Sequence, residues 1–401
     1  MKWETYKLKQ LCSEIVDCVN KTAPTSDVPT PYKMLRTSDI RGGKINLENL
    51  NCVTKEVYEK WTRRGKLQKG DVIFTREAPL GEVGLVREEK NYFLGQRLVL
   101  FRANDKICDG RFLMYSLLWH DNKQAIISKG VGSTVAHLRV PECENIEIKA
   151  PDLDIQHRIA DILSAYDDLI ENNQKQIKLL EEAAQRLYKE WFVDLRFPGH
   201  ENTKIVDGVP EGWQWCKVRD VADINSSTLP KNYKEDFIDY VDLGSVRCGH
   251  IETRTRYNLN EAPGRAKRCA KDGDIIWGMV RPNLKAYALV TNPKETDVFS
   301  TGFAVLSAKK VPYSYLYCAV TQEEFVGYLV NATNGAAYPA VKPVHFEVAD
   351  ILKPDDKVLE QFHSVADSIY RKKEALENQN HNLRESRDLI LPKLMSGEVE
   401  V

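Results

Sequence analysis

The chain has 401 residues, a formal net charge of −1 and an apolar fraction of 42%. This length favours two domains with connecting segments over a single core, and the apolar fraction excludes a mostly disordered chain. No apolar run approaches the roughly 18 residues of a membrane helix, and the first residues lack a signal-peptide core. The nine cysteines never form a C-x-x-C pair. This usage is typical of a reducing cytosol, so we expect a cytoplasmic protein without disulfides or a zinc site.

Positive charge is concentrated in two parts of the chain. Residues 1–150 carry a net charge of +6, whereas residues 151–198 and 351–401 are acidic. Within residues 247–285, nine Lys and Arg side chains stand against four acidic ones. Local basic stretches on a nearly neutral chain are typical of a protein that contacts phosphates at chosen places, although a solvated surface of mixed charge gives the same composition.

The first 150 residues show mostly the periodicity of short strands. Brief apolar runs lie at residues 72–74 and 97–101, and residues 110–124 have the pattern of a helix. From residue 155 to Trp191, apolar residues recur at steps of mostly three and four, including Leu169, with Asn173 in the apolar stripe. This stripe predicts a long helix that pairs with another helix and ends near residues 197–199. Trp191 and Phe192 at its end could dock a partner, but aromatic residues there more often pack locally.

The second half repeats this order. Apolar runs lie at residues 274–277 and 303–306, and residues 313–330 have a helical pattern. The final segment includes Val365 in its stripe and then places apolar residues seven apart, from Ile369 to Ile390. It predicts a second long helix that ends near Pro392. Each helix would have 35–40 residues and a length of about 50–60 Å.

Direct matches indicate a duplication. Trp3 and Trp213 open the two copies, and residues 69–74 match residues 272–277 around a shared Gly-Asp pair. We therefore predict an α+β protein with two similar globular domains, each with a curved antiparallel sheet, separated by two long antiparallel coiled-coil helices in a pseudo-two-fold repeat. The predicted segments are a first domain at 1–150, a central helical spacer at 151–198, a second domain at 199–350 and a C-terminal helical spacer at 351–401.

The sequence offers no catalytic constellation. It has no G-x-x-x-x-G-K-[ST] phosphate loop, no G-x-S-x-G elbow and no H-E-x-x-H helix. We therefore predict a protein that is not an enzyme and that holds no cofactor or metal. Two rivals stay open: a scaffold that binds only proteins through duplicated β-rich heads, and a free-standing nuclease, which would lack its chemistry.

Three segments resemble one known family, the specificity (S) subunits of type I restriction–modification systems. They are LYKEWFVDLRFPG at residues 187–199, GVPEGW at 208–213 and LILPKLMSGE at 389–398. The order domain–helix–domain–helix resembles that family over the whole chain, whereas residues 150–156 and 353–358 depart from its usual pattern before each helix.

The resemblance implies a role in reading DNA. Two target-recognition domains would each read one half of a split, asymmetric site in double-stranded DNA. The helices would separate the domains and dock two adenine-methyltransferase (M) subunits, and motor–nuclease (R) subunits would join for cleavage. The chain itself would be a non-catalytic specificity subunit.

Residues that could contact DNA gather in corresponding parts of the two copies. Arg suits guanine, Asn suits adenine, and a Gly loop lets the backbone approach DNA closely, although each such side chain could also be exposed and contact nothing. The loops at Arg76 and Arg281 are the strongest candidates, because they follow the repeated strand in surroundings that differ. In the first copy the candidates are Arg63, Arg64, Lys66, Arg76, Gly132, Ser133, Thr134 and His137. In the second copy they are Arg265, Lys267, Arg268, Arg281, Asn283, Lys285, Asn334, Tyr338 and Lys342.

Overall fold

The computed structural model describes residues 2–132, 136–333 and 339–401. These residues form two compact units. The first contains the chain up to Asn172 together with Gln379–Val401, and the second contains Asn173–Asn378. The first unit is therefore built from both ends of the sequence.

The first unit is built around an antiparallel sheet with the strand order β2-β10-β7-β8. Its strands are β2 (Cys12–Asp17), β10 (Leu98–Ala103), β7 (Val72–Arg76) and β8 (Leu80–Leu85). The two predicted strands of this domain lie in β7 and β10. A smaller sheet contains β6 (Asn51–Cys52), β3 (Lys33–Leu35) and β9 (Tyr92–Leu94), and its β3–β9 pair is parallel, which the sequence did not predict. Short elements complete the unit: β1 (Glu4–Lys7), α1 (Leu8–Leu11), β4 (Ile40–Arg41), β5 (Lys44–Ile45), α2 (Lys55–Trp61), α5 (Val140–Glu144) and β11 (Glu147–Ala150).

The second unit repeats this plan with the strand order β15-β24-β21-β22. Its strands are β15 (Ala222–Ile224), β24 (Phe303–Ala308), β21 (Ile275–Gly278) and β22 (Tyr287–Leu289). A second sheet contains β19 (Thr255–Asn258), β16 (Phe237–Val241), β23 (Asp297–Ser300) and β20 (Ala266–Arg268), again with one parallel pair, β16–β23. The short elements are β12 (Ile205–Val206), β13 (Val209–Pro210), β14 (Gln214–Lys217), α7 (Val218–Val221), β17 (Val246–Arg247), β18 (His250–Ile251), α10 (Pro343–Glu347) and β25 (Asp350–Lys353).

Each of the two helices that the sequence predicted within the domains, at residues 110–124 and 313–330, consists of two shorter helices in the structure. The first unit has α3 (Gly110–Leu118) and α4 (His120–Ser128), separated at Trp119, whose ψ of 131° is extended. The second unit has α8 (Tyr313–Thr321) and α9 (Glu323–Asn331), separated at Gln322. Both helices of a pair bury apolar side chains. The spacing of apolar residues therefore continues across the one-residue break, which is why the sequence predicted a single helix.

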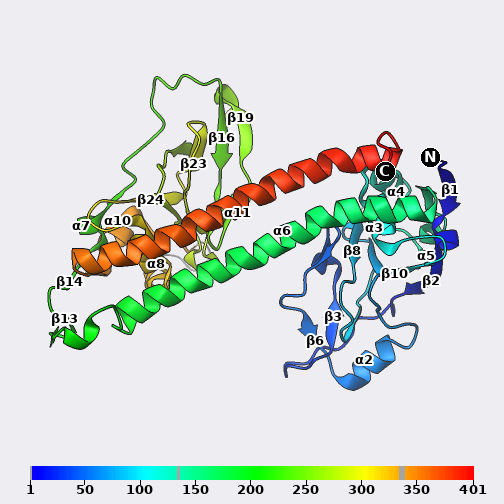
Figure 1. Cartoon of the computed structure of the whole chain (residues 1–401), viewed down its shortest axis with the longest axis horizontal. Helices are drawn as coiled ribbons and strands as arrows, with labels where there is room; N and C mark the ends of the chain where they lie inside the picture. Colours follow the sequence, from blue (N-terminus) through cyan, green and yellow to red (C-terminus); the bar gives the residue numbers. More distant parts are fainter. Residues whose placement is uncertain (1, 133–135, 334–338) are drawn as a thin grey trace. The chain divides into compact units, whose positions relative to one another are not determined.

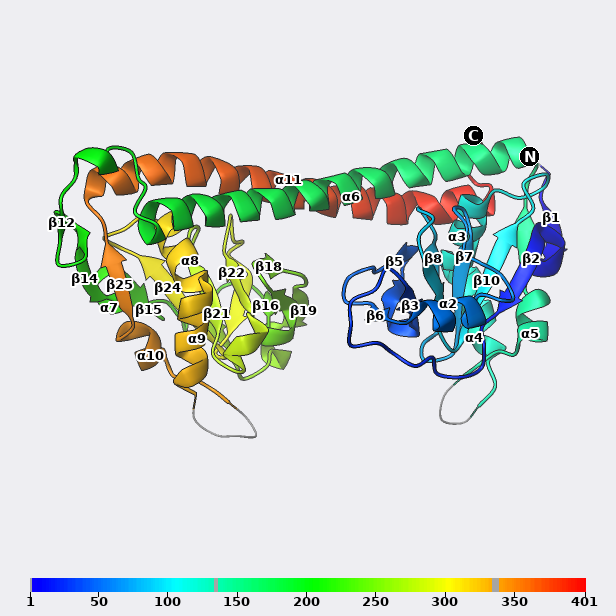
Figure 2. The ribbon, with the colours of Figure 1, turned by 90° about the horizontal axis from the view of Figure 1, so that it is seen from below.

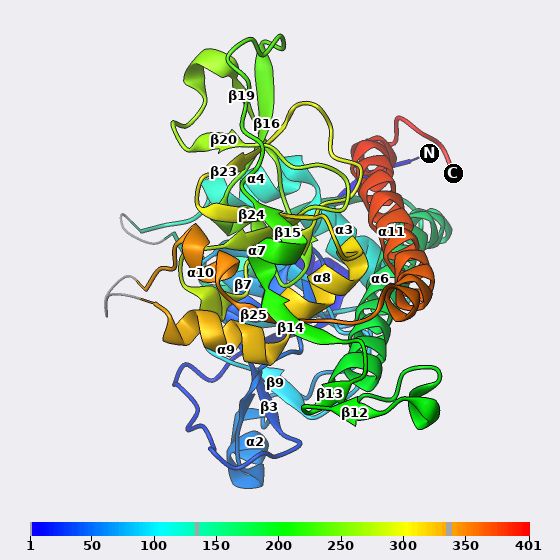
Figure 3. The ribbon, with the colours of Figure 1, turned by 90° about the vertical axis from the view of Figure 1, so that its left-hand side faces the viewer.

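The helix pairs pack on the central sheets and close the cores. In the first unit Phe112 of α3 shares a core with Phe74 and Phe101 of the sheet. In the second unit Tyr315 of α8 shares a core with Trp277, and Figures 2 and 3 show α8 and α9 beside that sheet. Burying each of these side chains stabilises the fold by about 1.5–3 kcal/mol. Because the same packing of helix on sheet occurs in both units, the predicted duplication includes the core.

Two long helices run through the chain, as predicted (Figure 1). Helix α6 spans Leu153–Tyr188, which is 36 residues, and α11 spans Asp356–Ser396, which is 41 residues. In the first unit the start of α6 is antiparallel to the end of α11, because Ile159 shares a core with Leu394 and Asp167 accepts a hydrogen bond from Arg387 at 2.6 Å. In the second unit the end of α6 lies beside the start of α11, where Tyr188 and Phe362 share a core.

The ends of these helices differ from the prediction. Helix α6 stops at Tyr188 and continues only as the π-helical turn Lys189–Val193, in which Phe192 is buried by local packing. Helix α11 continues through Pro392, because Leu394 beyond it is buried in the first unit's core. Gly397, with a φ of 77°, follows the end of α11.

The buried stripe of each helix is also shifted by one residue in places. Leu169 and Val365, both predicted in the stripe, are exposed, whereas Ile170 and Ala366 are buried. The shift arises because each helix packs on a globular domain as well as on the other helix. Within the part of the chain that the structure describes, no helix is long and apolar enough for a membrane span.

Candidate nucleic-acid interface

In both units, the strand that follows the Gly-Asp pair ends against the loop that precedes a short helix. In the first unit a β-bridge between Glu77 and His137 joins the end of β7 to the loop before α5. In the second unit a β-bridge between Val280 and Ala340 joins the end of β21 to the loop before α10. Candidates that are far apart in the sequence are therefore brought together at the same place in each copy.

Arg76 lies at the end of β7, but its guanidinium group is used inside the fold. Nη2 donates to Asp17 Oδ1 at 3.0 Å, and Nη1 donates to the backbone oxygen of Leu138 at 3.2 Å. The side chain is only 17% exposed. Arg76 therefore ties β2, β7 and the loop before α5 together, which favours a role in shaping the interface over a base contact.

Three further basic residues of the first unit lie between α2 and β7. They are Arg63, Arg64 and Lys66, and all three are exposed. Arg64 Nη1 donates to the backbone oxygen of Cys18 at 3.1 Å and lies 3.7 Å from Asp17 Oδ2. Because Asp17 also binds Arg76, this one carboxylate links the basic group to the strand end. Arg63 and Lys66 extend the positive surface beside it.

The Gly loop of the first unit is anchored at its base. His137 and Val131 exchange backbone hydrogen bonds of 2.9 and 3.0 Å, and the His137 side chain is half-buried. Gly132 is exposed and has a φ of 121°, a conformation that other residues rarely adopt. The predicted residues Ser133 and Thr134 lie outside the described residues.

The loop that follows the Gly-Asp strand of the second unit is exposed and strained. Arg281 and Lys285 flank the 3₁₀ turn Pro282–Leu284, and both have left-handed backbones, with φ values of 49° and 53°. A left-handed backbone conformation costs about 1–2 kcal/mol for a residue other than glycine. Such strained residues are concentrated at functional sites. Arg281 and Asn283 are exposed, while Lys285 forms an ion pair with Glu323. Unlike Arg76, Arg281 is thus presented at the surface.

The other basic group of the second unit lies on β20, at the edge of its sheet. Arg265 and Lys267 are exposed. Arg268 is half-buried, and its Nε is buried without a hydrogen-bond partner among the described residues. The pairing of β20 with β23 is irregular between Ala266 and Arg268, and such bulges re-aim side chains at sheet edges.

The last candidates of the second unit lie before α10. Lys342 is exposed at the N-cap of this helix. Asn334 and Tyr338 lie outside the described residues.

Arg256, which the sequence did not single out, is an exposed cation of this unit that the fold holds in place. Its Nε and Nη2 donate to the two carboxylate oxygens of Asp239 at 2.9 and 3.0 Å, and its guanidinium carbon lies 4.0 Å from the centre of the Phe237 ring. These hydrogen bonds hold the pKa of Asp239 below its usual value. The side chain is 61% exposed, so a fixed guanidinium group faces solvent at the edge strand β19. The basic stretch at 247–285 was a signal for it, but only the fold pairs it with Asp239.

The arrangement is suited to binding an anionic polymer. Arg and Lys side chains contact phosphates and the guanine edge, and Asn contacts adenine. Within residues 2–132, 136–333 and 339–401, no three His, Cys, Asp or Glu side chains are grouped so as to hold a metal ion.

The chain is similar to proteins of one kind. Residues 1–182 match the family described as the type I restriction modification DNA specificity domain. The type I restriction enzyme MjaIX specificity subunit of Methanocaldococcus jannaschii is 26% identical over 83% of this chain and 78% of that protein. The MjaVIII specificity subunit of the same organism is 26% identical over 92% of this chain and 86% of that protein.

A solved structure shares the fold of the chain. The S subunit of a type I restriction–modification system from M. genitalium aligns with a TM-score of 0.61 at 15% identity, covering 98% of this chain and 96% of that one. The family match, the relatives that span most of both copies and the shared fold agree with the resemblance of the three sequence segments. Residues 1–182 thus match this family, and the chain as a whole is similar to type I restriction enzyme specificity subunits.

Proposed function

We propose that this chain reads DNA sequence for a type I restriction–modification complex and carries no catalytic centre of its own. One observation carries the proposal. In both units the end of the Gly-Asp strand and the loop before a short helix form the same platform, but the exposed side chains around it differ. Two domains that recognise different DNA sequences need the same scaffold but different exposed side chains. Contacts to the bases determine which sequence is recognised, whereas contacts to the phosphates only fix the position of the protein on the DNA.

The domains at 1–150 and 199–350 are the proposed target-recognition domains, each reading one part of a bipartite, asymmetric site in double-stranded DNA. In the second, Arg281 and Asn283 are proposed to contact bases, because they are exposed on a strained loop. Cations on the edge strands of this domain are proposed to hold the phosphates. In the first domain, Arg63 and the Gly132 loop are proposed to contact bases and phosphates, and Arg76 to position the loop before α5.

The spacers at 151–198 and 351–401 are the proposed docking sites of two adenine-methyltransferase subunits, with motor–nuclease subunits joining the assembly. Both spacers are acidic, and they expose large apolar side chains such as Leu179 and Leu389. Glu181 lies 2.6 Å from Lys373 within the second unit, so the exposed Glu182 is the better probe of docking. Replacing Glu182 with Lys should weaken co-purification with the methyltransferase and leave the fold intact.

The test of DNA reading uses the chain assembled with its methyltransferase partner. Methylation profiling of host DNA identifies the site, and fluorescence anisotropy then compares matched and unmatched duplexes at two salt concentrations. Arg281→Ala should weaken binding to the matched duplex by about 1–3 kcal/mol, and Lys310→Ala, at an exposed lysine outside the interface, should not. Binding that ignores sequence in the assembled complex would refute the proposed function. An equal loss on both duplexes would assign Arg281 to a phosphate instead.

A further inference from the structure

The two units differ in the residue that lies beside the end of the Gly-Asp strand. In the first unit the backbone nitrogen of Arg76 donates to the backbone oxygen of Arg97 at 2.8 Å. In the second unit the backbone nitrogen of Met279 donates to that of Gly302 at 2.9 Å. Arg97 and Gly302 directly precede the neighbouring strands β10 and β24, respectively. They therefore occupy corresponding positions, one with an arginine and one without a side chain.

The opposite exchange occurs just after the same strand end. The equal spacing of the two β-bridges aligns Ala78 with Arg281, and both residues have a φ of 49°. Of these two pairs of positions, the first unit has its arginine at 97 and the second unit at 281. The scaffold is thus the same, but the guanidinium group is carried by a different segment in each unit.

The stability of the fold does not account for an arginine at position 97. The backbone of Arg97 has a φ of 70°, a left-handed conformation that favours glycine. Its ion pair with Glu77 is exposed, with side chains 51% and 30% accessible, and such pairs stabilise a fold little. The second unit has Gly302 and Val280 at these positions and forms no such pair. A Cβ atom on Gly302 would lie 2.8 Å from Leu243 Cδ1, so the second unit also leaves no room for a side chain there unless Leu243 shifts.

The ion pair orients the guanidinium group of Arg97 and leaves its far end available. Glu77 Oε2 lies 3.3 Å from Nε of Arg97, and the backbone of Glu77 is held by its bridge to His137. The two Nη groups form no hydrogen bond with any residue that the structure describes. A free pair of Nη donors matches the O6 and N7 acceptors of guanine in the major groove.

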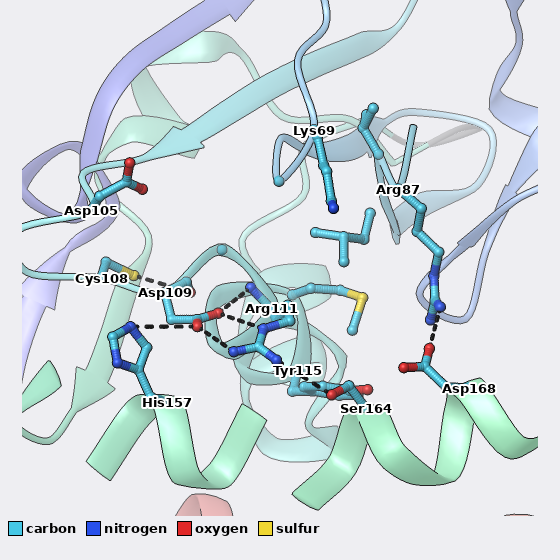
Figure 4. A pocket seen from close by; sticks show the side chains of 15 residues that line it. Lys69, Arg87, Asp105, Cys108, Asp109, Arg111, Tyr115, His157, Ser164 and Asp168 are labelled. Carbon is cyan, nitrogen blue, oxygen red and sulfur yellow. Dashed lines mark hydrogen bonds and ion pairs between the residues drawn. The ribbon is translucent and has the colours of Figure 1, made fainter. Parts of the chain in front are cut away.

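Other arginines of the first unit use an Nη group inside the fold. Figure 4 shows two of them in the cavity beside α3, where Arg87 Nη1 pairs with Asp168 and Arg111 Nη2 lies 2.9 Å from Asp109 Oδ2. These guanidinium groups serve to join elements of the unit to one another. Arg97 differs from them, because its only ion pair is through Nε.

We propose that Arg97 reads a guanine in the half-site that the first domain recognises. This inference rests on the proposed function and adds to it a specificity-determining residue of that domain. The Nη groups of Arg97 donate to O6 and N7 of the guanine, while Glu77 holds the side chain from the Nε side. Because Arg97 and Arg281 are carried by different segments of the repeated scaffold, the base pairs that they contact stand at different places within the two half-sites.

The test uses the chain assembled with its methyltransferase partner. Methylation profiling of host DNA identifies both half-sites, and fluorescence anisotropy then compares the matched duplex with duplexes in which one base pair at a time is replaced. The variant Arg97→Gly has the residue of the second unit and a backbone suited to the left-handed conformation. It should weaken binding to the matched duplex by about tenfold or more. It should also lose discrimination at one G·C pair of one half-site, while the other half-site is read as before.

Two further variants make the result decisive. Arg97→Gln keeps the length of the side chain without the guanidinium group and should give the same loss, so it decides if circular dichroism shows that Arg97→Gly does not fold. The control is Arg219→Ala, at an exposed arginine of α7, which should change neither affinity nor discrimination.

The outcomes separate this inference from the function on which it rests. A natural complex that ignores sequence would refute the proposed function and this inference with it. If the natural complex discriminates but the folded Arg97 variants bind like it, Arg97 does not contact DNA and the inference alone is overturned. An equal loss on matched and replaced duplexes would also overturn it, because a phosphate contact weakens all sequences alike.

Discussion

The ammonium group of Lys373 lies 2.6 Å from Glu181 Oε1 and also donates to the backbone oxygen of Gly249 at 2.8 Å. Lys373 belongs to α11, Glu181 to α6 and Gly249 to the turn between β17 and β18. One charged side chain, only 7% exposed, therefore joins both long helices to the globular part of the second unit. Truncating one member of a buried pair is costly, because the charge that remains stays buried without its partner.

We predict that Lys373→Ala lowers the free energy of unfolding by about 3–5 kcal/mol. The matched control is Lys372→Ala, at the exposed neighbouring lysine, which should change it by no more than about 0.5 kcal/mol. Urea unfolding followed by circular dichroism measures both. Similar small losses in the two variants would mean that solvent reaches the Lys373–Glu181 pair.

The same cluster predicts a dependence of stability on pH. His250 Nδ1 lies 2.7 Å from Glu377 Oε1, and Nε2 lies 3.3 Å from Glu181 Oε1. Burial lowers the pKa of His250, and so does the charge of Lys373, but the two carboxylates outweigh them and raise it to about 9. Because this pKa is raised above the ordinary value of 6.5, the stabilisation is fully present below about pH 6.5 and is lost as the pH rises to about 9.

We therefore expect the chain to lose about 1–2 kcal/mol of unfolding free energy between pH 6.5 and pH 9 through this group, a value reduced for the partial exposure of the ring. His250→Gln should be less stable than the natural chain at pH 6 and nearly as stable at pH 9. Urea unfolding across this pH range measures the difference. A constant gap between the two chains would show that His250 keeps the same charge in the folded and unfolded states.

The sequence predicted what depends on periodicity and repetition. The apolar stripes predicted both long helices, and the matching Gly-Asp strands predicted two copies of one domain. The stripe could not show that Ile170 is buried while Leu169 is exposed, because that choice depends on the domain surface against which α6 packs. Nor could it show the fixed position of Arg256, which requires Asp239 on a neighbouring strand.

Arg76 and Arg281 show the same limit within the candidate site. The sequence paired them, but the equal spacing of the two β-bridges aligns Arg281 with Ala78 and not with Arg76. Arg76 is held by Asp17, which lies 59 residues earlier in the chain. We predict that Arg76→Ala lowers the free energy of unfolding by about 1–3 kcal/mol, because Asp17 loses a charged hydrogen bond. Arg281→Ala should change stability by less than about 1 kcal/mol while weakening DNA binding. A double-mutant cycle with Asp17→Ala checks the first claim: if the two losses simply add, Arg76 and Asp17 are not coupled.

Leu394 and Leu389 lie close together on α11, but only one of them belongs to a core. Leu394 is 0% exposed in the core of the first unit, whereas Leu389 is 70% exposed. Leu394→Ala should cost about 2–5 kcal/mol through lost burial and the cavity left behind, and Leu389→Ala about 0.5 kcal/mol or less.

The position of this loss is as informative as its size. Because the last turns of α11 complete the first unit, hydrogen exchange in Leu394→Ala should accelerate for the amides of β7 and β10, and not for those of β21 and β24. The second unit, Asn173–Asn378, stands in the sequence between the two parts of the first unit. A dependence on nearness in the sequence alone would therefore show the opposite pattern. Equal acceleration in both units, or none in β7 and β10, would rule out a first domain whose core depends on the last residues of the chain.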